Sequence, residues 1–228
     1  MCLSVCFLTA AETREYSLNL GDGFIMAEKG ESTEEICALT GESKKNISDD
    51  FSGGGLLAIA VSRDAKTQIK LHSFVDNFSA TVQDISNLNE TSLDEYADSL
   101  SVKLGGDYEI KNNNGRNFIV LSKQMGDGQD SYFCTQYLTI CEGRVYCITC
   151  YNDGTAASSD ALSVLSAFKV EGNSVAAKDK SNKPEFILIA AGIGIFAAVA
   201  VWMVIGIIKD SRQQSGQNKQ NKNKREKD

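Results

Sequence analysis

Histidine is nearly absent from this sequence: His72 is the only one among 228 residues. A zinc site needs several ligands and nucleophilic catalysis needs a base beside its nucleophile, so one histidine cannot build either centre alone. His72 lies in an alternating stretch, residues 67–75, on the side that also carries Gln68 and Lys70. The pattern predicts a strand with this histidine on its solvent side, without a metal or catalytic role.

The first 170 residues also lack the clustered lysine and arginine of a nucleic-acid-binding domain. The formal net charge is −7, and the densest group of basic residues lies near the C-terminus, in residues 209–228. Binding to nucleic acid depends on basic clusters that neutralise phosphates. We therefore expect no nucleic-acid partner.

Three motifs resemble functional sites but lack the surroundings that such sites need. Residues 53–55 are glycines before a predicted strand, whereas a phosphate-binding loop follows a strand and opens a helix. Residues 125–130 lack the spaced oxygen ligands and final glutamate of a calcium loop. Cys147 and Cys150 form a CxxC on a predicted strand, where residues three apart point to opposite faces. We therefore assign no catalytic, cofactor-binding or metal-binding residue and expect no cofactor.

The sequence has seven cysteines, an odd number, and four of them fall in one predicted hairpin, residues 132–151. A two-residue turn predicts these cross-strand pairs: Cys141 with Arg144, Leu138 with Cys147, and Thr135 with Cys150. No cysteine faces another in this register. Cys134 and Cys147 share a face but stand roughly 13 Å apart, which exceeds disulfide reach. We therefore expect no obligatory disulfide.

One long hydrophobic run dominates the C-terminal part of the chain. Residues 186–208 carry no charge, and a helix of this length rises about 34 Å, enough for the ~30 Å hydrocarbon core of a bilayer. The run predicts a single transmembrane helix with the lipid bilayer as its partner. The rest of the sequence then divides into a globular domain at residues 15–170, a polar linker at 171–185 and a basic, disordered tail at 209–228.

Lysine and arginine are more frequent after this run than before it, and such residues concentrate on the cytoplasmic side of membrane proteins. We predict a cell-membrane protein with its globular domain outside and its C-terminus in the cytoplasm. The basic tail is a candidate for contact with anionic lipid headgroups, although an orientation signal alone explains its charge. The opposite topology, with the domain facing the cytoplasm, stays open.

Residues 1–14 resemble the end of a secretory signal peptide, because an apolar stretch is followed by small residues at positions 9–11. The basic start of such a signal is missing. A truncated signal, a lipoprotein box at Cys6 and a buried first strand are the alternatives that these residues leave open.

Periodicity over residues 15–170 predicts an α+β domain, an antiparallel sheet flanked by helices, followed by the transmembrane helix. Strands are expected at residues 16–20, 24–27, 56–62, 67–75, 107–111, 117–122, 132–141 and 144–151. Helices are expected at residues 32–39, 92–104 and 156–168, with a short helix or loop at 42–52. Ser32 and Ser92 each precede a glutamate by three positions, which predicts two capping boxes.

Two stretches support a family resemblance. Residues 16–24 read Tyr-Ser-Leu-Asn-Leu-Gly-Asp-Gly-Phe, and residues 136–144 read Gln-Tyr-Leu-Thr-Ile-Cys-Glu-Gly-Arg. With the order of elements, they resemble uncharacterised membrane-anchored extracytoplasmic proteins of Gram-positive bacteria, whose α+β domain is similar to the PsbP-like fold. The chain departs from that pattern in its incomplete signal peptide and in the cysteines of its last hairpin.

The resemblance implies a binding or assembly module and carries over no catalytic residue. The leading hypothesis is therefore a non-enzymatic domain that binds an unknown protein or envelope component. An envelope enzyme is the alternative, because catalytic groups can meet in space while lying far apart in sequence.

Overall fold

Seven antiparallel strands form one sheet in the order β2-β3-β4-β8-β7-β6-β5. The computed structural model describes residues 16–126 and 131–170, and the structural statements below concern these residues. The strands of the sheet are β2 (Phe24–Glu28), β3 (Leu56–Ser62), β4 (Thr67–Phe74), β5 (Asp107–Asn113), β6 (Arg116–Met125), β7 (Tyr132–Cys141) and β8 (Arg144–Asp153). Two short strands, β1 (Tyr16–Leu18) and β9 (Phe168–Val170), pair separately.

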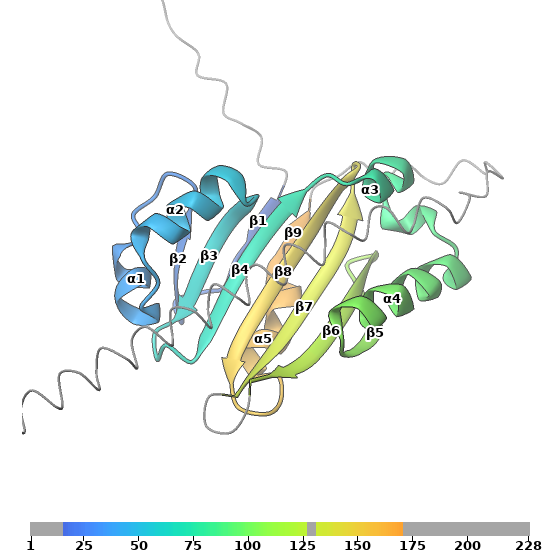
Figure 1. The fold of residues 1–228 in the computed structure, drawn as a ribbon. Coiled ribbons are helices and arrows are strands. Elements are labelled where there is room, and N and C mark those ends of the chain that lie inside the picture. Colours follow the sequence, from blue (N-terminus) through green and yellow to red (C-terminus); the bar gives the residue numbers. More distant parts are fainter. Residues whose placement is uncertain (1–15, 127–130, 171–228) are drawn as a thin grey trace, which may run out of the picture.

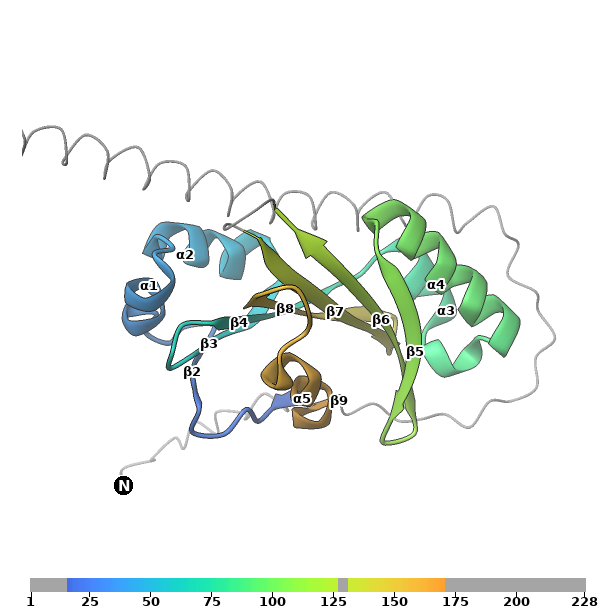
Figure 2. The ribbon, with the colours of Figure 1, turned by 90° about the horizontal axis from the view of Figure 1, so that it is seen from below.

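Helices cover both faces of this sheet (Figures 1 and 2). They are α1 (Glu34–Thr40), α2 (Lys44–Gly53), α3 (Asn77–Val82), the 3₁₀ turn η1 (Ile85–Asn87), α4 (Glu90–Leu104) and α5 (Ser159–Ala167). Helix α5 and the β1–β9 pair lie on one face, which we call the α5 face. Helices α1 to α4 lie on the other, which we call the α2–α4 face (Figure 2).

Two groups of helices cover the α2–α4 face. Helices α1 and α2 contact β2 and β3, whereas α3 contacts β7 and β8, and α4 contacts β5 at the opposite edge. In Figure 1 the middle strands β4, β8 and β7 run between these two groups of helices. The buried apolar residues of this face accordingly form two separate clusters, one under each group.

Both long hairpins have the predicted two-residue turns. Asn114 and Gly115 have φ of 53° and 81°, and Glu142 and Gly143 have φ of 49° and 74°. Positive φ at both central residues gives the twist that suits a tight hairpin. The predicted register of the second hairpin is confirmed, since Leu138 pairs with Cys147 as expected.

The α+β prediction is confirmed for the described residues, but some helix boundaries are wrong. Helix α4 begins at Glu90, and its N-cap is Asn89, whose side chain accepts a hydrogen bond from the backbone N–H of Ser92. Ser92 is therefore the third residue of the helix and not its N-cap. The side chain of Asn89 has the capping role that was predicted for Ser92. At α1 the N-cap is Thr33, without a side-chain cap. Neither capping box forms.

Three elements were not predicted: α3, the 3₁₀ turn η1 and β9. The N-cap of helix α3 is Asp76, which forms a reciprocal cap with Ser79. This pair does not follow the usual Ser/Thr-to-Glu/Gln pattern. Strand β9 begins at Phe168, the residue at which the predicted last helix was expected to end. Phe168 is 1% exposed there and packs with the core of the α5 face, so tertiary contact overrides the local preference.

No helix within residues 16–126 and 131–170 is long and apolar enough to cross a membrane. The predicted transmembrane helix at 186–208 lies outside the described residues. The same holds for the signal-like segment at 1–14, the linker at 171–185 and the tail at 209–228.

Candidate functional site

Polar side chains occupy the middle of the α2–α4 face, on three adjacent strands. The cross-strand pairs align three rows over β4, β8 and β7: Gln68 with Tyr151 and Cys134, Lys70 with Thr149 and Gln136, and His72 with Cys147 and Leu138. We call these residues, apart from Leu138, the polar strip. Apolar clusters bound it on both sides, so the strip is where this face differs chemically from an ordinary core.

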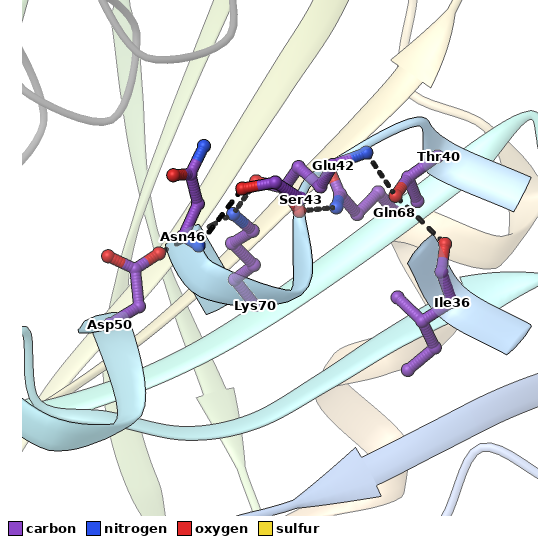
Figure 3. A network of polar contacts seen from close by, with 8 residues as sticks. All are labelled: Ile36, Thr40, Glu42, Ser43, Asn46, Asp50, Gln68 and Lys70. Atoms are coloured by element: carbon purple, nitrogen blue, oxygen red, sulfur yellow. Dashed lines mark hydrogen bonds and ion pairs between the residues drawn. The ribbon is translucent and has the colours of Figure 1, made fainter. Parts of the chain in front are cut away.

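Lys70 places a buried charge in the strip. Its side chain is only 4% exposed, and Nζ lies 2.6 Å from Glu42 Oε1 and 3.8 Å from Asp50 Oδ2 (Figure 3). The amide of Gln68 donates to the other oxygen of Glu42 at 2.9 Å. A buried ammonium is tolerated only where carboxylates compensate it, and here they come from the α1–α2 loop and from α2. The network therefore ties this pair of helices to the sheet.

Asp50 is the less strongly held of the two carboxylates. Burial raises the pKa of its side chain above the ordinary value, an effect larger than the opposing pull of Lys70. Glu42 also adds a like charge nearby, which raises the pKa of Asp50 further. The cluster thus carries two carboxylates against one ammonium.

The prediction that His72 faces solvent is wrong. The alternation correctly groups it with Gln68 and Lys70, but its cross-strand neighbour Cys147 belongs to a buried apolar cluster of this face, and His72 is 1% exposed. Burial, and then the charge of Lys70, lowers the pKa of His72 to about 3. The imidazole is therefore neutral at physiological pH. Its Nδ1 has no hydrogen-bond partner among the described residues.

The CxxC cysteines point to opposite faces, as predicted. Cys147 belongs to a cluster on the α2–α4 face, and Cys150 to the core of the α5 face. All five described cysteines are free thiols. Burial raises the pKa of Cys134 to about 12 and of Cys147 to about 11, so neither is a thiolate at neutral pH.

A pocket of about 230 Å³ opens where the polar strip ends. It is lined by Leu39, Thr40, Val61, Ala65, Lys66, Gln68, Tyr132, Tyr151, Asn152 and Asp153. We call it the tyrosine pocket, because Tyr132 and Tyr151 form an edge-to-face pair in its lining, with ring centroids 5.9 Å apart. It lies between the end of α1, the β3–β4 turn and the ends of the β7–β8 hairpin.

The α1 wall of the pocket is held by the Lys70 network. Thr40 Oγ1 donates to the carbonyl of Ile36 at 2.9 Å and accepts from the backbone N–H of Glu42 at 3.2 Å. Glu42 in turn binds Gln68, a second lining residue (Figure 3). Two lining side chains from different elements are therefore fixed by one chain of hydrogen bonds.

The opposite wall is the β3–β4 turn, which is equally well fixed. Ser62 Oγ donates to Asp64 Oδ1 at 2.6 Å, and the same oxygen accepts from the backbone N–H of Lys66 at 3.1 Å. The carbonyl of Lys66 accepts from the N–H of Asp153 at 3.1 Å, which joins the turn to the end of β8. Ala65 takes a left-handed conformation with φ of 59°. The walls are thus preformed.

One polar group of a lining residue has no hydrogen-bond partner in the described ranges. The hydroxyl of Tyr132 is buried and has no hydrogen-bond partner in the part of the chain that the structure describes. Burial raises the pKa of this phenol, so it stays neutral and can both donate and accept a hydrogen bond. A buried hydroxyl without a partner costs free energy.

Sequence analysis missed this pocket entirely. Its lining residues extend from Leu39 to Asp153, so no local motif contains them. The only signal was the placement of tyrosines at the outer ends of the last predicted hairpin. A larger cavity of about 330 Å³, lined by residues that include Arg116, Phe168 and Lys169, lies beside β9. No group of three or more potential metal ligands occurs within the described ranges.

No family model matches the chain, and no curated protein matches it. A crystal structure from Bacteroides thetaiotaomicron is similar over 70% of this chain at 9% identity, with a TM-score of 0.43. The match covers 46% of that structure, so this chain spans about half its length. The extracellular domain of PknH from Mycobacterium tuberculosis is similar over 67% of this chain and 78% of its own, at 12% identity and a TM-score of 0.24.

Proposed function

We propose that this chain is a single-pass membrane protein whose α+β domain faces the outside of the cell and acts as a binding module. The observation that carries the binding role is the tyrosine pocket. Its walls come from three separate parts of the chain and are fixed by hydrogen bonds through Asp64 on one side and Glu42 on the other. A preformed pocket binds a ligand at a smaller entropic cost than a pocket that must order itself.

The ionisable groups of the polar strip support binding rather than catalysis. A general base works best with a pKa near the operating pH, but His72 has a pKa of about 3. A thiol nucleophile needs a lowered pKa, but that of Cys134 is raised to about 12. The sequence resemblance to the PsbP-like fold favours the same role, since such domains are mostly binding or assembly modules.

The membrane anchor and the orientation rest on the hydrophobic run at 186–208 and on the basic residues after it. A ligand of the domain would then be an envelope component or an extracellular partner. The basic tail would lie in the cytoplasm against anionic headgroups.

The topology is tested by treating intact bacteria that express the full chain with a protease. One antibody detects the globular domain, and a second detects a tag after Asp228. We expect the domain to be digested while the tagged tail is protected. If the domain is protected until the cells are lysed, the domain faces the cytoplasm and the proposal fails.

A further inference from the structure

We propose that the tyrosine pocket binds one ring of a neutral sugar. This inference rests on the proposed binding function and specifies its ligand class. Three features of the pocket support a sugar ligand: its volume, its mixture of aromatic and amide groups, and the Tyr132 hydroxyl that has no partner in the described ranges.

The volume limits the ligand to a small ring. Pockets for drug-sized molecules measure roughly 300–1,000 Å³. The tyrosine pocket, at about 230 Å³, lies just below that range. It therefore suits a single six-membered ring of a longer glycan, with the rest of that glycan extending out of the pocket.

The lining matches the two sides of a sugar ring. A pyranose has faces of aliphatic C–H groups and an edge of hydroxyls. Tyr132 and Tyr151 provide aromatic surface, and the negative faces of such rings attract C–H groups. Leu39 and Val61 add apolar contacts, whereas Gln68 offers an amide to hydroxyls.

The charges of the lining select against an ionic ligand. Lys66 and Asp153 contribute one charge of each sign, so the pocket favours neither an anion nor a cation. Lys66 is also close to a carboxylate of its own, with Nζ 3.9 Å from Asp64 Oδ2. A neutral polyhydroxyl ring needs no desolvation of charge when it enters such a pocket.

The Tyr132 hydroxyl supplies the specific polar contact. It is buried without a partner in the described ranges, and a sugar hydroxyl is both a donor and an acceptor. The hydroxyl of Tyr108, by contrast, has a partner: it donates a hydrogen bond to Asp94 at 3.0 Å, between β5 and α4. These two tyrosines give a matched pair for a test.

The test uses the full chain in a detergent without a sugar headgroup. Glucose and N-acetylglucosamine are titrated separately, with alanine as a zwitterionic probe, and saturation-transfer NMR reports binding. We expect both or one of the sugars to bind and Tyr132→Phe to weaken that binding about five- to tenfold, the loss of one hydrogen bond. Tyr108→Phe should leave the dissociation constant unchanged.

A second pair of variants checks the location without touching a tyrosine. Lys66→Glu places a second carboxylate beside Asp153 and should not abolish binding of a neutral ring. Ala65→Trp should fill the pocket with its side chain and abolish sugar binding. Lys169→Trp, at the larger cavity beside β9, is the matched control and should bind normally. Circular dichroism of each variant confirms that it is folded.

Three results would overturn the inference. They are absence of binding by either sugar, equal weakening by Tyr132→Phe and Tyr108→Phe, and preferential binding of alanine. None of these changes the protease result on intact cells. A domain that is digested from outside but binds no sugar would therefore disprove the ligand class and leave the membrane-anchored domain in place.

Discussion

The ammonium group of Lys70 lies 2.6 Å from Oε1 of Glu42, although the two residues are 28 positions apart in the sequence. Lys70 belongs to β4, an inner strand of the sheet, and Glu42 to the short connection between α1 and α2. Their side chains are 4% and 16% exposed. One ion pair thus joins the middle of the sheet to a helix pair at its edge.

Removal of one partner should destabilise the domain strongly. Glu42→Ala leaves the buried ammonium of Lys70 with only Asp50 at 3.8 Å, and such a change costs about 3–5 kcal/mol. Urea unfolding measures the loss. The control is Glu34→Ala, whose pair with Lys44 is 77% and 70% exposed and should contribute less than about 1 kcal/mol. Equal effects of the two variants would contradict a structural role for the buried pair.

Stability should fall as the pH is lowered from about 7 towards 5, because His72 is held neutral. Its folded pKa of about 3 lies below the ordinary value of 6.5, so the unfolded state binds the proton first. The contribution of neutral His72 to the free energy of unfolding is fully present above pH 6.5. It is lost progressively below that pH, and the loss reaches about 2 kcal/mol at pH 5. Asp50, with a raised pKa, acts in the opposite direction at lower pH.

The variant His72→Gln isolates this effect. Its free energy of unfolding, measured from pH 7 to pH 5, should lose about 2 kcal/mol less than that of the original chain. Parallel curves for the two proteins would mean that His72 is not the group that titrates.

The cysteines of the β7–β8 hairpin should be poorly reactive in the folded protein. The pKa values of Cys141 and Cys147 are each raised to about 11 by burial, so the thiolate fraction at pH 7.5 is very small. We expect iodoacetamide to modify the half-buried Cys37 at least tenfold faster, measured by mass spectrometry of peptides. Rapid modification of Cys147, faster than that of a free thiol, would instead favour the alternative of a redox enzyme.

Gly55 should tolerate no side chain. Its φ is +73°, and a Cβ would lie 2.6 Å from the carbonyl oxygen of Ser73 on the neighbouring strand. Gly55→Ala should therefore destabilise the domain by at least about 1–3 kcal/mol in thermal or urea unfolding. Gly23, which has no atom within 4 Å of such a Cβ, is the control and should accept alanine with little change.

Local sequence patterns predicted the strands and the register of the last hairpin, but not which helices pack against the sheet. Alternation placed Lys70 and His72 on one face, and turn residues gave the register that pairs Leu138 with Cys147. The burial of that face could not be predicted, because it depends on helices that lie elsewhere in the sequence. For the same reason Lys70 could not be paired with Glu42 beforehand. The sequence also did not reveal which residue of the triple glycine must lack a side chain, because the close approach of Gly55 to Ser73 depends on the pairing of two strands.

The tyrosine pocket was beyond sequence reasoning for a related reason. Thr40, Lys66 and Tyr132 come from a helix end, a turn and a strand start, and only the sheet order brings them together. Each residue type is common at such positions, so none of them marks a site by itself.

The pairing of β1 with β9 sets the order in which the domain can be completed during synthesis. Tyr16 lies opposite Val170, so the first described strand has its partner only after nearly the whole domain has been made. Until then Leu18, which is 7% exposed in the finished domain, cannot reach its place in the core beside Phe168. Closing so long a loop is entropically costly, and the β1–β9 contact is expected to form last. A nascent chain that stalls before Phe168 would therefore lack the partner strand of β1. We expect proteases to cleave such a chain at its unpaired N-terminal strand.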